Sequence, residues 1–530
     1  MIRISNTKLN LDYNDTDIKK SVAKQLRVDE STIETISLYR RSVDARHKND
    51  VHFIATLDVT LNKNENTVIA KAKNKNAIIC EKYQYHAPYK NDLSARPVII
   101  GFGPAGMFCA LILAQCGQKP IVIERGDKVE NRTKKINALW DNRILDTESN
   151  VQFGEGGAGT FSDGKLNTGT KDSRARKVLN EFVNHGAPEE ILYNAKPHIG
   201  TDMLINTVKN IRNEIIALGG EIRFNTKLIG INHKENKVTS VNVSCNGTTD
   251  IIETDNVILA IGHSARDTFA MLNDMKIFME PKIFSVGARI EHLRQSIDKA
   301  QYGDFHNNKS LGAADYKMNV KESNDRGVYT FCMCPGGMVV AAQSEENTVV
   351  TNGMSNFARD NNNSNSALLV NVYPEDFGTD DVLGGIEFQR KIEKQAFLCG
   401  GADYSAPVQR VGDFLNNRNS ECFGDVLPSY KPGTKFSKLD DFLPHYVTDA
   451  LREGIINMNK KLKGFAHHDA VLTGAETRSS SPVRITRDDT MQSISLKGLY
   501  PCGEGAGYAG GIISAAVDGI RCAEQILAQA

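Results

Sequence analysis

The hydrophobic pattern of residues 1–92 predicts a small α+β domain. The pattern gives, in order, a strand over 3–11, a helix over 15–26 and strands over 33–40 and 51–61. In the helix, Ile18, Val22 and Leu26 fall on one face, and the strands show polar and apolar residues in alternation. This order of elements predicts a ferredoxin-like arrangement.

A different pattern begins at residue 97. A short apolar run at 97–100 has no polar alternation, as expected for a parallel strand buried on both faces. Helix-forming residues follow over 107–114, and a second apolar run occupies 121–123. The segment therefore predicts a βαβ unit with a parallel sheet.

The rest of the chain is less regular. Residues 127–274 show mixed α/β patterning, and 275–485 are rich in short strands, Gly, Asn and Asp, with a strand over 284–290 and a polar loop over 360–366. We expect a linker at 88–96 and a final helix over 512–528. The predicted domains are 1–92, 93–274, 275–485 and 486–530.

Composition sets limits on this picture. The chain has 530 residues, which is too long for one hydrophobic core. Its 64 basic and 64 acidic residues balance, so there is no net positive charge to attract nucleic acid. The basic run at 40–48 is either a solvated hairpin turn or a phosphate or RNA contact. Scattered cysteines, with no secretory pattern and no membrane-length apolar run, favour a cytoplasmic protein without a membrane anchor.

The glycines of the βαβ unit are the first residues that indicate a binding site. Gly101 permits a tight turn, Gly103 lets a pyrophosphate approach the backbone, and Gly106 lets the helix pack close to the strand. The pyrophosphate would sit on free amides at the helix N-terminus, and Glu124 would accept hydrogen bonds from the adenosine ribose. This order of parts predicts a dinucleotide site, which by itself serves NAD or FAD.

Later segments decide between the two cofactors. A strand ends at Ala260-Ile-Gly262, a second strand ends at Gly503-Glu504, and Gly510-Gly511 precede the last helix. These segments resemble the FAD-binding domain of the glutathione-reductase-like superfamily, in which two distant glycine segments hold one FAD. The resemblance implies that Glu504, which is usually Asp, binds a ribityl hydroxyl, and that amides of the last helix face the flavin.

The chain resembles the bacterial family of FAD-dependent, or NAD(FAD)-utilising, dehydrogenases still more closely. The likeness covers nearly the whole chain through these motifs: residues 42–46, 101–106, 150–166, 330–337, 476–484 and 503–519. It implies a Rossmann-like FAD domain in an α/β fold with α+β parts. It also implies an inserted β-rich substrate domain, and it names a family without naming a reaction.

The glycine cluster at 154–159 also matches the glycine spacing of the dinucleotide motif. No clear strand precedes it and no good helix follows, so we expect a loop beside the flavin or pyrophosphate, with Ser162 and Lys165 near the ring. A glycine-rich packing turn is the alternative. A second Rossmann unit and a CxxC are not recognisable, so NAD(P)H, if used, would bind transiently.

The catalytic candidates are Arg478, His292 and Cys334. Arg478 could hold a carboxylate or phosphate, or it could pair with Glu476 or with another domain. His292 could relay a proton or be structural. Cys332 and Cys334 would face the same side of a strand, either as a redox pair or as small buried hydrophobes.

The sequence thus predicts an FAD-dependent oxidoreductase that moves hydride between a small molecule and flavin N5. An FAD-carrying RNA- or protein-binding module and an FAD-dependent monooxygenase are the alternatives, and the oligomeric state is left open. The predicted cofactor residues are Gly101, Gly103, Pro104, Ala105, Gly106, Glu124, Arg125, Gly156, Gly157, Ala158, Gly159, Ser162, Lys165, Leu228, Ala260, Gly262, Gly503, Glu504, Gly510, Gly511 and Ile512.

Overall fold

The N-terminal part of the chain folds as a ferredoxin-like domain. The computed structural model describes residues 1–88, 93–167, 169–323 and 326–529, so 89–92 of the expected linker lie outside it. The elements are β1 (Ile2–Leu9), α1 (Asp15–Leu26), β2 (Ile33–Asp44), β3 (His52–Leu61), α2 (Glu65–Ala72) and β4 (Ala77–Ile79). Their antiparallel order, β2-β3-β1-β4, confirms the predicted arrangement, and α1 has the predicted bounds.

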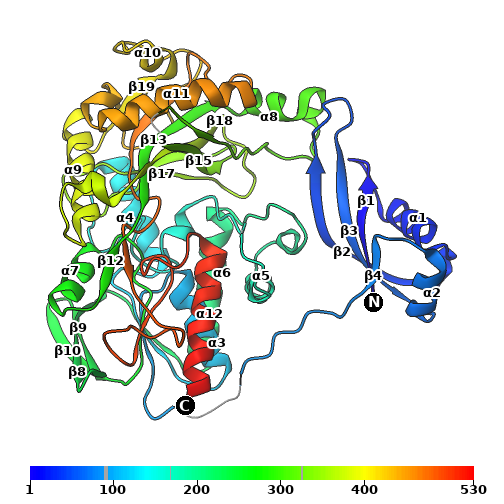
Figure 1. The fold of residues 1–530 in the computed structure, drawn as a ribbon, viewed down its shortest axis with the longest axis horizontal. Helices are drawn as coiled ribbons and strands as arrows, with labels where there is room; N and C mark the ends of the chain where they lie inside the picture. The colour runs from blue at the N-terminus through cyan, green and yellow to red at the C-terminus, as the bar shows by residue number, and fades with distance from the viewer. Residues whose placement is uncertain (89–92, 168, 324–325, 530) are drawn as a thin grey trace.

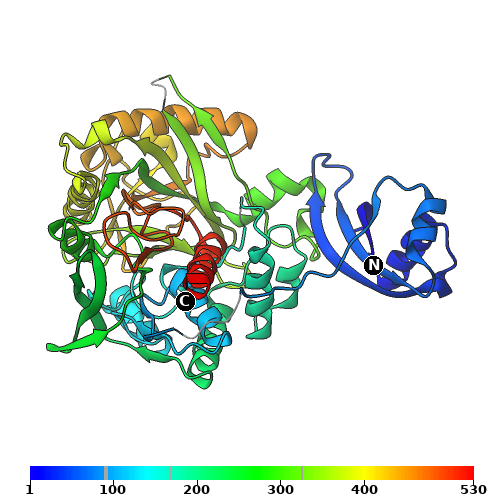
Figure 2. The same ribbon diagram turned by 60° about the horizontal axis from the view of Figure 1, so that its bottom comes forward.

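This domain stands to one side of the molecule, and the β2–β3 hairpin reaches back to the main body near α8 (Arg294–Tyr302) (Figures 1 and 2). Arg41 donates to the Asn194 side chain, and the Lys48 ammonium donates to the carbonyl oxygen of Gln301. Arg46 pairs with Asp44 inside the turn. The basic run at 40–48 therefore forms the end of a strand and a hairpin turn, and part of it holds the domain to the body.

A parallel sheet lies at the centre of the dinucleotide domain. Its strand order is β23-β11-β5-β6-β7. The strands are β5 (Val98–Ile100), β6 (Ile121–Ile123), β7 (Glu221–Arg223), β11 (Val257–Leu259) and β23 (Leu499–Pro501). The predicted apolar run at 97–100 is fully buried at its strand residues because neighbours cover both faces. The sheet brings β5 and β23, which are far apart in the chain, to the two sides of β11.

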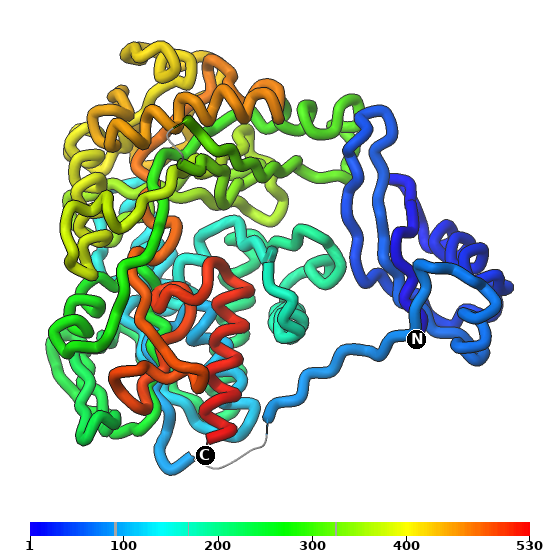
Figure 3. Tube along the Cα trace, viewed as in Figure 1, coloured from blue at the N-terminus to red at the C-terminus, as the bar shows by residue number. Residues whose placement is uncertain are grey.

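Helices cover this sheet. They are α3 (Pro104–Gln115), α4 (Val129–Asn142), α5 (Arg174–Asn184), α6 (Thr201–Ala217), α7 (Arg266–Asp274) and α12 (Ile512–Gln529). A small antiparallel sheet, β8 (Thr226–Lys234), β9 (Lys237–Cys245) and β10 (Thr248–Glu253), lies at its edge. Helices α3 and α12 run side by side (Figure 3), and an added Cβ on Gly519 would lie 2.0 Å from the Ala105 oxygen. The glycine therefore lets the two helices meet at backbone distance.

Residues 282–482 build a second layer above the first. Its sheet has the order β14-β15-β18-β13-β21-β19-β20. Its strands are β13 (Phe284–Leu293), β14 (Asn319–Lys321), β15 (Gly327–Cys334), β18 (Asn363–Val372), β19 (Ala406–Arg410), β20 (Thr434–Phe436) and β21 (Val471–Glu476), with the ribbon β16 (Met338–Ala341) and β17 (Thr351–Met354). Strands β12 (Met279–Pro281) and β22 (Val483–Ile485) pair where the chain enters and leaves this layer.

One expectation for this layer is wrong. The layer is β-rich, as expected, and α8, α9 (Gly384–Cys399), α10 (Val411–Leu415) and α11 (His445–Lys461) also belong to it. The polar run at 360–366 is not a loop, because Asn363 begins the buried strand β18. Polar partners make that burial possible: Asn363 donates to Glu291, and Asn365 accepts from Arg289.

Short 3-10 turns complete the description: η1 (Glu30–Thr32), η2 (Ala158–Phe161), η3 (Glu189–Leu192), η4 (Gly303–Asn307), η5 (Pro374–Phe377) and η6 (Leu439–Asp441). Within the described ranges, no helix combines the length and apolar character that a membrane crossing needs. Together these elements give the mixed α/β fold that the sequence predicts.

Candidate functional site

A cavity of about 650 Å³ lies between the parallel sheet and the second layer. Its walls come from the glycine loop after β5, the end of β6, the loop at 152–165, the start of β8, the end of β11 and the N-terminus of α12. The second layer contributes the end of β15 and the segment at 476–479. This volume is typical of small-molecule and cofactor sites.

The glycine loop forms one end of the cavity. Gly101 has a φ of +98°, and an added Cβ would lie 2.3 Å from the carbonyl oxygen of Ala260, so only glycine fits there. Glu124, which is 4% exposed, accepts from the backbone amides of Phe102 (2.8 Å), Gly126 (2.9 Å) and Gly154 (3.0 Å). The carboxylate thus ties three loops together at the edge of the cavity.

The backbone leaves room for a dinucleotide. An added Cβ on Gly262, Gly510 or Gly511 would meet nothing within 4 Å, and one on Gly103 would meet only Gly157, at 3.7 Å. All four glycines line the cavity. Because they have no side chains, the space beside them stays open. Helix α3 begins at Pro104, and the first amides of a helix have no partner within the helix. The residues present therefore fit a pyrophosphate and a flavin.

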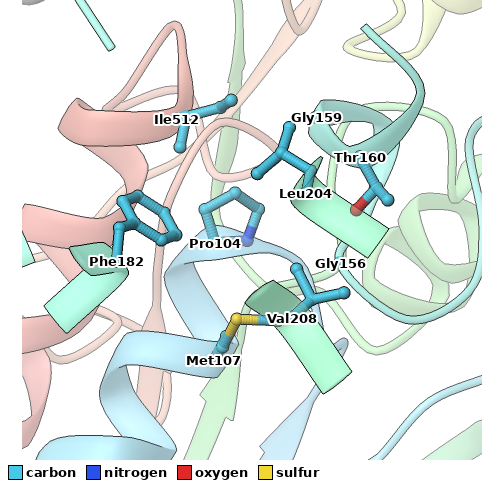
Figure 4. A pocket seen from close by; sticks show the side chains of 9 residues that line it. All are labelled: Pro104, Met107, Gly156, Gly159, Thr160, Phe182, Leu204, Val208 and Ile512. Carbon is cyan, nitrogen blue, oxygen red and sulfur yellow. The ribbon is translucent and has the colours of Figure 1, made fainter. Parts of the chain in front are cut away.

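The second glycine cluster is a loop, and it crosses the first. An added Cβ on Gly157 would lie 2.9 Å from the Cα of Gly103. Gly156 turns away from the cavity: its amide donates to the Phe102 oxygen at 2.8 Å, and it lines a separate apolar gap of about 10 Å³ (Figure 4). The gap, which Met107 and Phe182 also line, is packing space between helices.

The predicted flavin contacts also line the cavity. They are Glu504, Ser162, Lys165 and the first residue of α12, Ile512. Burial raises the pKa of Glu504 to about 7, and the Lys282 charge opposes this shift. The Lys165 ammonium donates to the carbonyl oxygen of Met333 in the second layer. Lys165 and the N-terminus of α12 therefore both bring positive charge to the cavity wall.

Most predicted cofactor residues line the cavity. They are Gly101, Gly103, Pro104, Ala105, Glu124, Arg125, Gly157, Ala158, Gly159, Ser162, Lys165, Leu228, Ala260, Gly262, Glu504, Gly510, Gly511 and Ile512. Gly106, Gly156 and Gly503 do not line it. Gly106 packs against the Gly101 oxygen, and the Gly503 amide donates to Asp518 at 2.8 Å. These two glycines shape the backbone instead of touching a ligand.

Arg478 lines the cavity, but its guanidinium is already paired. Its Nε and Nη2 donate to the carboxylate of Glu393 at 3.1 and 3.0 Å, and its Nη1 donates to Ser344 at 2.6 Å. Arg266 binds the same carboxylate. Glu476, the other partner that the sequence suggests, pairs with Arg289. A bidentate hold on a substrate is therefore not available to Arg478 in this arrangement.

His292 does not line the cavity, so its predicted role in proton relay is not supported. The ring is 2% exposed, its Nε2 lies 2.8 Å from the Phe465 oxygen, and burial lowers its pKa to about 4. It is a structural histidine, which was the alternative reading. The histidine that does reach the cavity is His263.

Sequence reasoning missed His263. It follows Gly262, lines the cavity, and its Nε2 lies 3.9 Å from Glu504. Burial and the charges of Arg478 and Arg266 lower its pKa to about 3, so the ring is neutral at physiological pH. Its position directly after the strand that ends beside the cofactor site was the signal that could have identified it.

The cysteines do not lie as the sequence suggests. Cys334 is fully buried behind the cavity wall, and Cys332 lines the cavity. The pairing of β15 with β18 shifts between Phe331 and Cys334, and Cys332 has a φ of +46°. This β-bulge breaks the alternation that would have placed both thiols on one face.

Comparisons with known proteins match family models to three parts of the chain. A model described as pyridine nucleotide-disulphide oxidoreductase matches residues 95–279, and one described as FAD-dependent protein, C-terminal domain-like, matches 283–479. A domain of unknown function matches 1–60. A protein of Clostridium beijerinckii, described as uncharacterised, is 50% identical over 530 residues, covering 99% of this chain and 98% of that protein.

Solved structures of flavoproteins are similar at low identity. A triple mutant of the flavin-dependent brominase Bmp2 is 11% identical, with a TM-score of 0.37, over 82% of this chain and 80% of that one. Glycerol-3-phosphate dehydrogenase from Bacillus halodurans, complexed with FAD, is 12% identical, with a TM-score of 0.36, over 82% and 64%. Glycine oxidase from Bacillus cereus is 12% identical, with a TM-score of 0.33, over 82% and 96%.

Proposed function

We propose that this chain moves hydride between a small molecule and flavin N5. The chain belongs to the same family as the Clostridium beijerinckii protein and is an FAD-dependent oxidoreductase. We further propose that it is a dehydrogenase or reductase of the NAD(FAD)-utilising type. In this proposal NAD(P)H, if it is the donor, binds transiently.

One observation carries this proposal: residues of both layers line a single cavity. Glu124 and Glu504 are among the lining residues of the first layer, and the end of β15 and the segment at 476–479 line it from the second. The match of a model described as FAD-dependent to residues 283–479 supports a role for that layer in the same site. An FAD bound along the cavity would leave the second layer as the surface that meets the substrate.

Flavin, when bound, supplies the centre that accepts or gives hydride. The chain's own residues would bind and tune it. Amides at the start of α3 would hold the pyrophosphate, and Glu124 would accept from the adenosine ribose. The positive end of α12 and the Lys165 ammonium favour negative charge in the cavity, and the neutral His263 ring can accept a hydrogen bond there.

The absorption spectrum of the purified protein tests the proposal. We expect a flavin spectrum, or one restored by added FAD, that bleaches anaerobically with NADH, NADPH or a member of a metabolite panel. Protein that stays colourless after FAD is added would refute FAD binding. Bleaching that needs oxygen and yields a hydroxylated product would instead indicate a monooxygenase.

A further inference from the structure

Two thiols stand at the wall where the second layer meets the cavity. Cys332 lines the cavity, and Cys334 lies behind it, fully buried. The Cys334 thiol donates to the Cys332 carbonyl oxygen at 3.3 Å, and the two thiols are close enough for each to shift the pKa of the other. One thiol is therefore accessible from the cavity, and the second is within reach of the first.

The backbone holds this arrangement at a cost. Cys332 has a φ of +46°, a left-handed conformation that is unfavourable for a non-glycine residue and persists only where the surroundings enforce it. The surroundings are specific. An added Cβ on Gly337 would lie 3.0 Å from the Cβ of Cys334, and one on Gly353 would lie 2.0 Å from the Arg289 guanidinium. Glycines at these positions make room for the cysteine loop and for the cation beside it.

Two cations approach the loop. Nη1 of the fully buried Arg289 lies 3.2 Å from the Cys332 carbonyl oxygen and 3.8 Å from the Cys334 sulfur. The Lys165 ammonium donates to the oxygen of Met333, the residue between the cysteines. The hydrogen bond from Cys334, with the charges of Lys165 and Arg289, lowers the pKa of the Cys332 thiol against the effects of burial and of Asp163. The groups that face Cys332 thus favour its thiolate, the nucleophilic form.

We propose that Cys332 and Cys334 are a redox pair that carries two electrons between the flavin and a small disulfide or dithiol in the cavity. The inference rests on the proposed flavin site and names a substrate class for it. Cys332, facing the cavity, is the attacking thiol, and Cys334, buried beside it, is the resolving thiol.

The chemistry balances in both steps. The Cys332 thiolate attacks the substrate disulfide, forms a mixed disulfide and releases one thiolate. Cys334 then loses its proton and attacks the Cys332 sulfur, which releases the second thiolate and leaves the Cys332–Cys334 disulfide. Two electrons from the reduced flavin, which a reduced nicotinamide supplies as hydride, and two protons break that bond and restore both thiols.

The oxidation state of the two cysteines can be measured without an assay of enzyme turnover. Holoprotein is oxidised with diamide, unreacted thiols are tagged with a maleimide, and the peptides are identified by mass spectrometry. We expect Cys332 and Cys334 to escape tagging together, with a peptide mass lower by two hydrogen atoms. Anaerobic dithionite titration of the same sample should then consume twice the electrons per flavin that a flavin alone needs.

Single variants separate the two sulfurs. Cys332→Ser and Cys334→Ser should each halve the electron uptake, and Cys422→Ser, which removes an exposed cysteine, should keep the wild-type value. A long-wavelength thiolate–flavin band should survive in Cys334→Ser and vanish in Cys332→Ser.

Two results would overturn the inference: wild-type protein that takes up the electrons of flavin alone, or a disulfide mapped to Cys502 and Cys522, whose sulfurs lie within 4.8 Å of each other. Either result leaves the flavin proposal standing, because the spectrum tests FAD binding separately. Failure to bind FAD, seen in the absorption spectrum, would refute the flavin proposal independently of the cysteine measurements.

Discussion

Replacing Gly103 with alanine separates cofactor binding from folding. The φ of Gly103 is −76°, which any residue adopts, and an added Cβ would meet only the Gly157 Cα, at 3.7 Å. Alanine is a poorer N-cap than glycine by about 0.5–1 kcal/mol, and it lowers the entropy of the unfolded chain by a similar amount. We therefore expect the free energy of unfolding of the apoprotein to change by less than about 1 kcal/mol.

The effect on FAD should be much larger. The added methyl group would occupy the space through which a pyrophosphate approaches the amides of α3. Each charge-assisted hydrogen bond lost costs about 1.5–3 kcal/mol, which corresponds to roughly 10- to 100-fold in Kd. Fluorescence titration of apoprotein with FAD measures the Kd, and guanidinium denaturation measures the stability.

A matched glycine provides the control. Gly327→Ala, at the start of β15, would add a Cβ that meets only the flexible Asn371 side chain, at 3.2 Å, and should leave the Kd for FAD unchanged. If folded Gly103→Ala protein binds FAD as tightly as wild type, the glycine loop does not hold the pyrophosphate, and the reasoning fails.

Three further predictions concern carboxylates. Glu124→Gln should lower the free energy of unfolding by about 1–3 kcal/mol for each backbone amide left without an acceptor, measured by denaturation of the apoprotein. Burial raises the pKa of Glu504, so the folded apoprotein binds its proton more tightly than the unfolded chain, and the stability that Glu504 contributes should be lost as pH rises from 4.5 to about 7. Glu504→Gln should remove this contribution, which is measured as the difference between the stability–pH curves of the two proteins. Glu393→Gln leaves two buried arginines without their shared anion and should cost about 3–5 kcal/mol in a thermal or chemical melt, whereas an unchanged melt would contradict the ion-pair cluster.

Local sequence pattern was enough for the dinucleotide unit. Gly101, Gly103 and Glu124 lie within one strand–helix–strand segment, so their spacing along the chain fixes their spacing in space. The same is true of α1, where one apolar face and an Asn14 cap give both the helix and its start. The ferredoxin-like domain and the Rossmann-like sheet follow from such short-range rules.

Only the tertiary structure decided the partners of charged and polar side chains. Arg478 meets Glu393, which lies 85 residues away along the chain, and no spacing rule chooses Glu393 over Glu476. Asn363 enters a buried strand because Glu291, from another strand, accepts its amide proton. A polar residue is buried where a partner happens to lie, and the fold sets that position.

The cysteine motif shows the same division. The sequence by itself places Cys332 and Cys334 two residues apart and, by strand alternation, on one face. The tertiary structure adds a bulge that directs Cys332 into the cavity and buries Cys334 behind it. A bulge depends on the register with a distant strand, which local sequence pattern does not set. The glycine loop could therefore be predicted from the sequence, and the cavity wall at the cysteines could not.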